Sequence, residues 1–278
     1  MENDAGKIAE YTADVRALEA VACKDWLTNK VDRSITGKVA RQQCQGELQL
    51  PRSDCGVMAL DYNGRAGIAT SIGHAPQVSL IDSAKGSVMA VAEALTNIVG
   101  TPVKGGLSGI SLSANWMWPC KNEGEDAALY RAVEACSDFV CSLGINIPTG
   151  KDSLSMTQKY GDDKVYAPGT VIISAAGEVK NVRRTLSPVI QNRTSQLLYT
   201  DFSSSPLPLG GSALAQTPIR LPPGPPTVDN AAHADFTSHA TQTALTLVHI
   251  QYNHPPTHDP TSVLPPRLAP TPPPHPVL

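Results

Sequence analysis

A glutamate and an asparagine four residues apart are the side chains in this sequence best spaced for binding chemistry. Glu93 and Asn97 lie within residues 86–100, where apolar residues recur at steps of three and four and Gly100 marks a stop. Residues at this spacing project from one face of a helix. A carboxylate and an amide oxygen on adjacent turns suit Mg²⁺, which takes few carboxylates together with waters and a substrate phosphate. The same pair also occurs on solvated helices, so the helix alone leaves both interpretations open.

Two further charged side chains could complete such a site. Asp54 precedes the strand-like run 55–60 and would supply a third oxygen ligand. Lys24 could neutralise phosphate beside the cation. This combination is the chemistry of phosphoryl transfer, in which a bridging cation and a lysine offset charge on the phosphate oxygens. Spacing does not establish the assembly, because surface charges are ordinarily solvated.

Composition narrows the class of protein. Hydrophobic residues make up 41% of the 278 residues but aromatic ones only 5%, so a core must be mostly aliphatic. A net charge of -3 gives no electrostatic support for binding nucleic acid or a membrane surface. No apolar run approaches the roughly 20 residues that cross a bilayer, and the first residues are acidic where a signal peptide would be basic. The six cysteines include no C-x-x-C pair, so we expect reduced, buried thiols in a cytoplasmic protein.

The hydrophobic pattern predicts a chain of mixed helices and strands. Asn63-Gly64 is the strongest hairpin signal. We expect the helix at 125–142 to turn Leu129, Val133, Cys136, Val140 and Leu143 toward the core. The predicted helices span 7–21, 86–100 and 125–142, the predicted strands span 55–60, 67–71, 78–81, 110–118 and 170–179, and residues 148–153 are predicted to form a turn.

The composition changes after about residue 188. Of the 24 prolines, 17 lie at or after Pro206, and six of the seven histidines lie at or after His233. Proline lacks the donor that a sheet needs, so we expect polyproline-like or disordered chain at the end. Residues 209–216 could open a helix before that point. The histidines have no metal-finger spacing and are interpreted as solvated.

Seven sequence blocks, in order, resemble the phosphoribosylformylglycinamidine synthase family, glutamine-dependent ligases of purine biosynthesis. The resemblance extends from about residue 20 to about residue 190 and matches the second of the two duplicated halves of the synthase region. The blocks are Val-Asp-Arg-Ser-Ile-Thr-Gly-Lys-Val-Ala-Arg (31–41), Pro-Arg-Ser-Asp-Cys (51–55), Ile-Gly-His-Ala-Pro (72–76), Ala-Val-Ala-Glu-Ala-Leu-Thr-Asn (90–97), Leu-Ser-Ala-Asn-Trp-Met (112–117), Gly-Glu-Asp-Ala-Ala-Leu-Tyr (124–130) and Pro-Thr-Gly-Lys-Asp-Ser-Leu-Ser-Met (148–156).

The resemblance implies an α/β fold of the α+β type, shared with aminoimidazole ribonucleotide synthase. Residues 1–190 would form the N-terminal subdomain, with helices and a mainly antiparallel sheet that pairs with its counterpart. Residues 191–260 would form an incomplete second subdomain, and residues 261–278 a Pro-rich, disordered tail.

The resemblance also implies an activity, a C–N ligase reaction. The family uses ATP and glutamine-derived ammonia to convert formylglycinamide ribonucleotide to formylglycinamidine ribonucleotide. Carried over by motif, the magnesium ligands of a nucleotide site would be Asp54, Glu93 and Asn97, with Ser53 touching the nucleotide and Lys24 beside its phosphates. Asp259 stands where the family has a further magnesium ligand, although the Ser-Asp-Gly-Gly that follows there is replaced by Pro260-Thr-Ser-Val-Leu.

We therefore expect a fragment that supplies a Mg²⁺ and ATP or ADP half-site and is inactive alone. The adenine nucleotide would be its partner, and formylglycinamide ribonucleotide would bind only with the missing synthase half present. No catalytic residue is predicted, and Cys136 and Cys141 are interpreted as core residues rather than as a glutaminase nucleophile. Two alternatives stay open: a non-enzymatic interaction protein that uses its Pro-rich tail, and another ATP-dependent phosphotransferase of the same fold.

Overall fold

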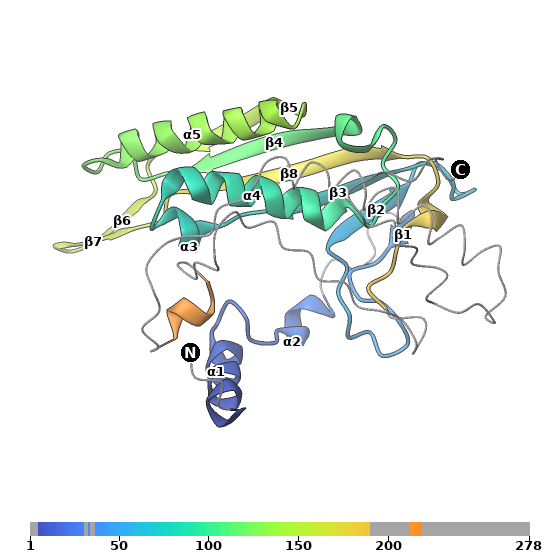
Figure 1. The fold of residues 1–278 in the computed structure, drawn as a ribbon, viewed down its shortest axis with the longest axis horizontal. Helices are drawn as coiled ribbons and strands as arrows, with labels where there is room; N and C mark the ends of the chain where they lie inside the picture. The colour runs from blue at the N-terminus through green and yellow to red at the C-terminus, as the bar shows by residue number, and fades with distance from the viewer. Residues whose placement is uncertain (1–4, 31–32, 34–36, 190–211, 218–278) are drawn as a thin grey trace.

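The computed structural model describes residues 5–30, 33, 37–189 and 212–217 (Figure 1). Within them, six strands form one sheet in the order β1-β2-β3-β8-β4-β5, in which only β4 and β5 run parallel. The mainly antiparallel sheet with helices confirms the predicted fold class. The strands are β1 (Val39–Arg41), β2 (Cys55–Ala59), β3 (Gly67–Gly73), β4 (Ile110–Met117), β5 (Asn146–Ser153) and β8 (Thr170–Val179), and β6 (Thr157–Tyr160) and β7 (Asp163–Tyr166) form a separate hairpin.

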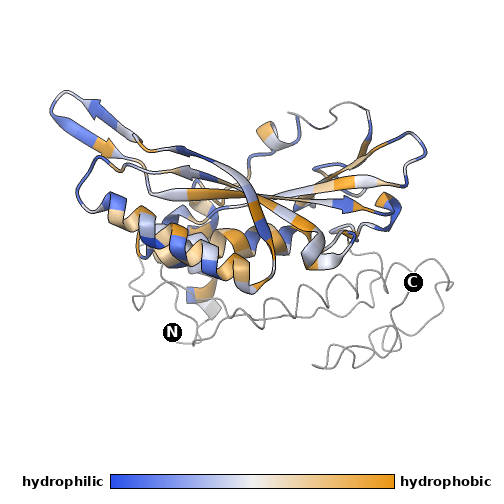
Figure 2. Cartoon of the chain, turned by 90° about the horizontal axis from the view of Figure 1, so that it is seen from above, coloured by the Kyte–Doolittle hydropathy of each residue, from blue (hydrophilic) through white to orange (hydrophobic). Residues whose placement is uncertain are grey.

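Two long helices lie side by side on one face of the sheet (Figures 1 and 2). They are α4 (Ser83–Ile98), which packs on β3 and β8, and α5 (Glu125–Ser142), which reaches β5. The shorter helices are α1 (Ala5–Ala17), α2 (Asp25–Thr28), α3 (Pro76–Ser79) and the 3₁₀ turns η1 (Gly106–Gly109), η2 (Val182–Arg184) and η3 (Leu214–Gln216). In the part of the chain that is described, no helix has both the length and the hydropathy to span a membrane.

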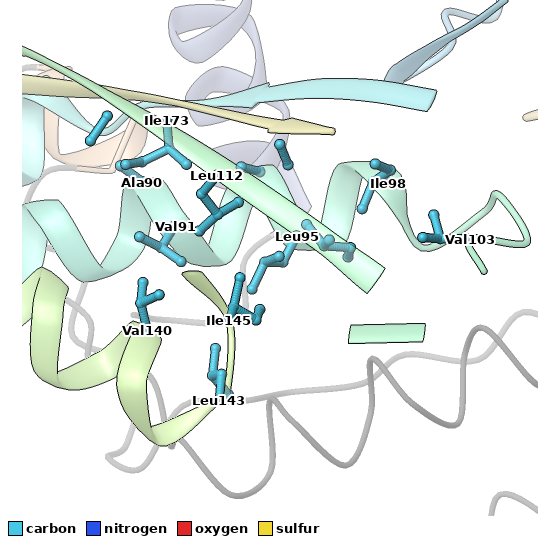
Figure 3. Packing of buried hydrophobic residues seen from close by; sticks show 14 of the residues in the cluster. Ala90, Val91, Leu95, Ile98, Val103, Leu112, Val140, Leu143, Ile145 and Ile173 are labelled. Carbon is cyan, nitrogen blue, oxygen red and sulfur yellow. The ribbon is translucent and has the colours of Figure 1, made fainter. Parts of the chain in front are cut away.

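Helix α4 is the element that joins the two layers. Asp82 caps its N-terminus, where the carboxylate accepts a hydrogen bond of 3.1 Å from the Lys85 backbone N–H. Val91 and Leu95 are fully buried between Leu112 and Ile173 of the sheet and Val140 of α5 (Figure 3). The aliphatic core predicted from the low aromatic content is therefore confirmed.

The opposite face of the sheet keeps apolar side chains in contact with solvent. Residues alternate between buried and exposed along β3, and Ile68 and Ile72 are on its exposed side. Met58 of β2 pairs with Ile68 and is also exposed. On this apolar sheet face Met58 is 38% exposed, Ile68 43% and Ile72 59%.

One predicted strand is wrong. Residues 78–81 lie partly in α3, which begins at Pro76, and Val78 is its single buried residue. A proline at the first helical position fixes a helical φ and needs no amide donor there. Leu80 and Ile81, whose apolar character suggested a strand, are exposed.

The predicted turn at 148–153 is also wrong, because these residues belong to β5. This strand is at the edge of the sheet and pairs with β4 alone, so Pro148 can occupy it. A Cβ on Gly150 would be 2.5 Å from the Ala114 carbonyl oxygen, so the glycine allows the two strands to approach.

Other predicted elements hold. The predicted helix 125–142 and strand 170–179 have the bounds of α5 and β8, and β2, β3 and β4 occupy the other predicted strands. Val133 is an exception within α5, since it is 43% exposed while Ala132 and Phe139 are buried instead. The predicted domain boundaries at 190 and 260 lie outside the described residues and stay predictions, and the helix suggested at 209–216 is described only as η3.

The six cysteines differ in burial. Cys44 and Cys136 are buried as predicted, but Cys23 and Cys141 are exposed, so the interpretation of Cys141 as a core residue is wrong. The helix turns Cys141 outward because the adjacent Val140 occupies the core face. Burial raises the pKa of the Cys136 thiol to about 12, which suppresses the reactive thiolate.

Truncation of the central leucine should test the packing of α4. Leu95→Ala is expected to lower the free energy of unfolding by about 2–5 kcal/mol, because Leu95 is fully buried. Val133→Ala, on the exposed face of α5, should cost about 0.5 kcal/mol or less. Urea denaturation of both variants measures the difference, and equal losses would contradict the described packing.

Thiol labelling should test the burial of the cysteines. At pH 8 an aromatic disulfide reagent is expected to modify Cys23 and Cys141 fast, and to modify Cys44 and Cys136 only on unfolding, because these two are buried. Cys141→Ser should remove one fast-reacting thiol, whereas Cys136→Ala should leave the fast phase unchanged. A fast phase that is lost in Cys136→Ala would show that α5 does not pack as described.

Candidate functional site

The C-terminal end of β3 meets the second half of α4, where the predicted ligand pair lies. The backbone N–H of His74 donates a hydrogen bond of 2.7 Å to Glu93 Oε2. Asn97 Nδ2 donates a hydrogen bond of 2.9 Å to the Ile72 carbonyl oxygen. Both predicted ligands are thus attached to the same strand end, two residues apart along it.

These two hydrogen bonds leave specific oxygens for a ligand. Asn97 uses its NH₂ group on the strand, so the amide is oriented with Oδ1 turned to other partners. Glu93 uses Oε2, which is also 3.7 Å from His74 Nδ1, and its side chain is 45% exposed. Within the described residues neither Asn97 Oδ1 nor Glu93 Oε1 accepts a hydrogen bond, which suits two hard oxygen ligands for a cation.

The helix itself adds negative potential at this position. Asn97 is the second-last residue of α4, which ends at Ile98, and Glu93 is one turn earlier. Backbone carbonyls at a helix C-terminus carry partial negative charge, which favours a cation. The charge of Glu93 and the dipole therefore act in the same direction.

Asp54 lies at the same end of the sheet. It directly precedes β2, whose first residue, Cys55, pairs with Ser71 of β3. This register places the backbone of Asp54 near the strand end that contacts Glu93 and Asn97, and the Asp54 side chain is exposed. In the described part of the chain, no hydrogen bond or ion pair joins Asp54 to either of the other two.

Ser53, the predicted nucleotide contact, has an unsatisfied hydroxyl. Its backbone N–H donates to the Gln43 carbonyl over 2.9 Å, but its Oγ is buried and has no partner among the described residues. A buried hydroxyl without a hydrogen bond costs about 1–3 kcal/mol, so a partner that reaches it would be stabilising. An oxygen-rich ligand such as phosphate would satisfy it.

Lys24 is not brought to the other predicted residues. It precedes α2, and its ammonium donates to the carbonyl oxygens of Glu19 and, over 2.9 Å, of Ala22. Helix α2 is linked to the site's loop through Arg52, which donates to Thr28 Oγ1 over 3.1 Å. The Lys24 ammonium therefore forms hydrogen bonds only with nearby residues of its own segment, among those described.

The site also includes groups that the sequence did not indicate. Ile72 and His74 act through backbone atoms, so their side-chain types carried no signal. Arg52, which precedes Ser53, connects α2 to the loop, and its residue type alone does not indicate this contact. Asp259 lies outside the described residues.

The predicted donor set is too small to be a metal cluster of protein side chains alone. Among the described residues, no group of three or more His, Cys, Asp and Glu could hold a metal ion. The predicted set there contains two carboxylates and an amide oxygen, which is consistent with a cation that also takes phosphate and water ligands. The unsatisfied Ser53 hydroxyl next to Asp54 supports the fit.

Comparisons with known proteins identify the family of the chain. The family model of the FGAR-AT PurM_N-like domain matches residues 23–178, more than half of the chain. Human phosphoribosylformylglycinamidine synthase is 44% identical over 217 residues, which are 77% of this chain and 16% of that protein. The chain belongs to the FGAR-AT PurM_N-like domain family.

Solved structures show more distant likenesses. PurLQS from Thermotoga maritima is 16% identical, with a TM-score of 0.43, over 55% of this chain and 23% of that chain. T. maritima PurL complexed with ADP is 19% identical, with a TM-score of 0.39, over 49% of this chain and 21% of that chain.

Proposed function

We propose that this chain supplies a magnesium–adenine nucleotide half-site of a glutamine-dependent C–N ligase that makes formylglycinamidine ribonucleotide. The observation that carries the proposal is the attachment of Glu93 and Asn97 to the end of β3. This attachment occurs in a chain that is 44% identical to human phosphoribosylformylglycinamidine synthase over 217 residues. The same identity favours the synthase over another phosphotransferase of this fold.

Each site residue has a separate task in the proposal. Asp54, Glu93 and Asn97 hold the cation through oxygen atoms, and the Ser53 hydroxyl donates to a phosphate oxygen. Lys24 offsets phosphate charge once its ammonium leaves the Glu19 and Ala22 carbonyls. A bound Mg²⁺ offsets charge on the phosphate oxygens. Asp259 is retained as a proposed further ligand.

The complete reaction belongs to a larger assembly in this proposal. The chain spans only 16% of the length of the human relative. We therefore expect no synthase turnover from the chain alone, and binding of formylglycinamide ribonucleotide only together with the other synthase half. The apolar sheet face of Met58, Ile68 and Ile72 supports pairing with that half, because an exposed apolar face favours association. The proposed location is the cytoplasm.

The alternative of a Pro-rich interaction segment has no structural observation in its favour. The residues that carry it, 217–278, lie outside the part of the chain that is described except for Thr217. It stays a prediction from composition.

Nucleotide binding should depend on both Mg²⁺ and the acidic ligands. Isothermal titration of the full chain with ADP is expected to show binding with Mg²⁺ and at least tenfold weaker binding with EDTA. Asp54→Ala and Glu93→Ala should each weaken binding tenfold or more, because each removes a charged oxygen ligand.

Glu134→Ala provides a matched control, since Glu134 is an exposed carboxylate on α5. It should bind Mg²⁺ and ADP like the wild type. Unchanged affinity in both Asp54→Ala and Glu93→Ala would refute the assigned site, and a folded wild type that does not bind ADP would refute the half-site itself.

A further inference from the structure

Four consecutive residues at the end of β3 each contact α4. Ser71 Oγ donates a hydrogen bond of 2.6 Å to the Ala94 carbonyl oxygen, and both groups are buried. Ile72 and His74 make the backbone hydrogen bonds to Asn97 and Glu93. Gly73 lies between Ile72 and His74, and its Cα directly faces the backbone of α4.

Gly73 leaves no room for a side chain. A Cβ there would be 2.1 Å from the Ala90 carbonyl oxygen and 2.4 Å from the Ala94 backbone nitrogen. Both atoms are helix backbone, four residues apart, so neither can rotate away as a flexible side chain could. Even an alanine must therefore separate β3 from α4 or distort the helix.

Separation would act on the two hydrogen bonds that flank Gly73. They measure 2.7 and 2.9 Å, and hydrogen bonding weakens beyond about 3.2 Å. Restoring an ordinary contact for the new Cβ requires a shift of about 1 Å, which would break both. Glu93 and Asn97 would then lose the strand contacts that fix their side-chain orientations.

We propose that Gly73 is a positioning residue that holds β3 close enough to α4 to orient Glu93 and Asn97 as cation ligands. The inference rests on the proposed magnesium–nucleotide site. In this proposal Gly73, which has no side chain, keeps the ligand side chains oriented before the cation binds. Preorganised ligands bind more tightly because their ordering does not have to occur on binding.

A glycine of α4 that packs against α3, instead of β3, provides the control. Gly86 is buried near the start of α4, and a Cβ there would be 2.0 Å from Ser79 Oγ and 2.7 Å from Ser79 Cα of α3. It is also a closely packed site, with backbone atoms at 2.7 Å, but Glu93 lies almost two turns further along the helix. Gly86→Ala should therefore perturb stability without reorienting the ligands.

The experiment uses the full chain with Mn²⁺ and ADP, with bound Mn²⁺ measured by electron paramagnetic resonance. Both alanine variants are expected to unfold at lower temperature than the wild type. Only Gly73→Ala should weaken Mn²⁺ binding in the presence of ADP, by at least tenfold. Wild-type affinity in a folded Gly73→Ala, or an equal loss in Gly86→Ala, would overturn the inference.

A wild type that binds no Mn²⁺ would instead refute the proposed site, so the two failures are distinguishable. Should Gly73→Ala not fold, hydrogen exchange in the wild type provides the second test. If the strand end holds the ligands, Mg²⁺ with ADP should slow exchange of the His74 amide at least fivefold, whereas the amide of Lys85 should not respond. Unchanged His74 exchange with bound nucleotide would overturn the inference.

Discussion

The close packing of β3 against the second half of α4 is the contact on which the rest of the structure depends. Alongside this contact, α4 also packs on β8, and its residues Val91 and Leu95 are fully buried. The contact with β3 brings the backbone of Ile72 and His74 within hydrogen-bonding distance of two polar side chains on the same helix. Core formation and site formation therefore arise from one interface, and small residues at that interface make it possible.

The carboxylate of Glu93 is electrostatically unfavourable in the protein alone, and a bound cation would stabilise it. Glu93 places negative charge near the C-terminus of α4, where the helix dipole disfavours an anion. The His74 N–H offsets part of that cost by donating to the carboxylate. A cation would offset more of it, which is a physical reason for a glutamate at this position. The buried hydroxyl of Ser53 is a second group whose unfavourable state a ligand would relieve, because the ligand would supply its missing hydrogen-bond partner.

Sequence reasoning succeeded where a local pattern determines local structure. The 3.6-residue periodicity identified α4 and α5, and the i, i+4 spacing placed Glu93 and Asn97 on one helix face. It failed at 78–81 and 148–153, because short apolar or turn-rich runs take their structure from tertiary context: α3 packs on α4, and β5 pairs with β4. The strand contacts of the site could not be predicted, since Ile72 and His74 contribute backbone atoms that no residue type reveals. Lys24 was placed beside a phosphate from its charge and from the family resemblance, and the sequence could not reveal its hydrogen bonds to local carbonyls.

A cation is proposed to bind where the end of β3 meets α4. Paramagnetic broadening of amide signals by Mn²⁺, added with ADP to ¹⁵N-labelled protein, tests it directly because the effect falls steeply with distance. The amides of Gly73, His74 and Asn97 are expected to broaden first, while those of Ser83 and Lys85 at the other end of α4 persist. Broadening that begins elsewhere, or uniformly along α4, would contradict it.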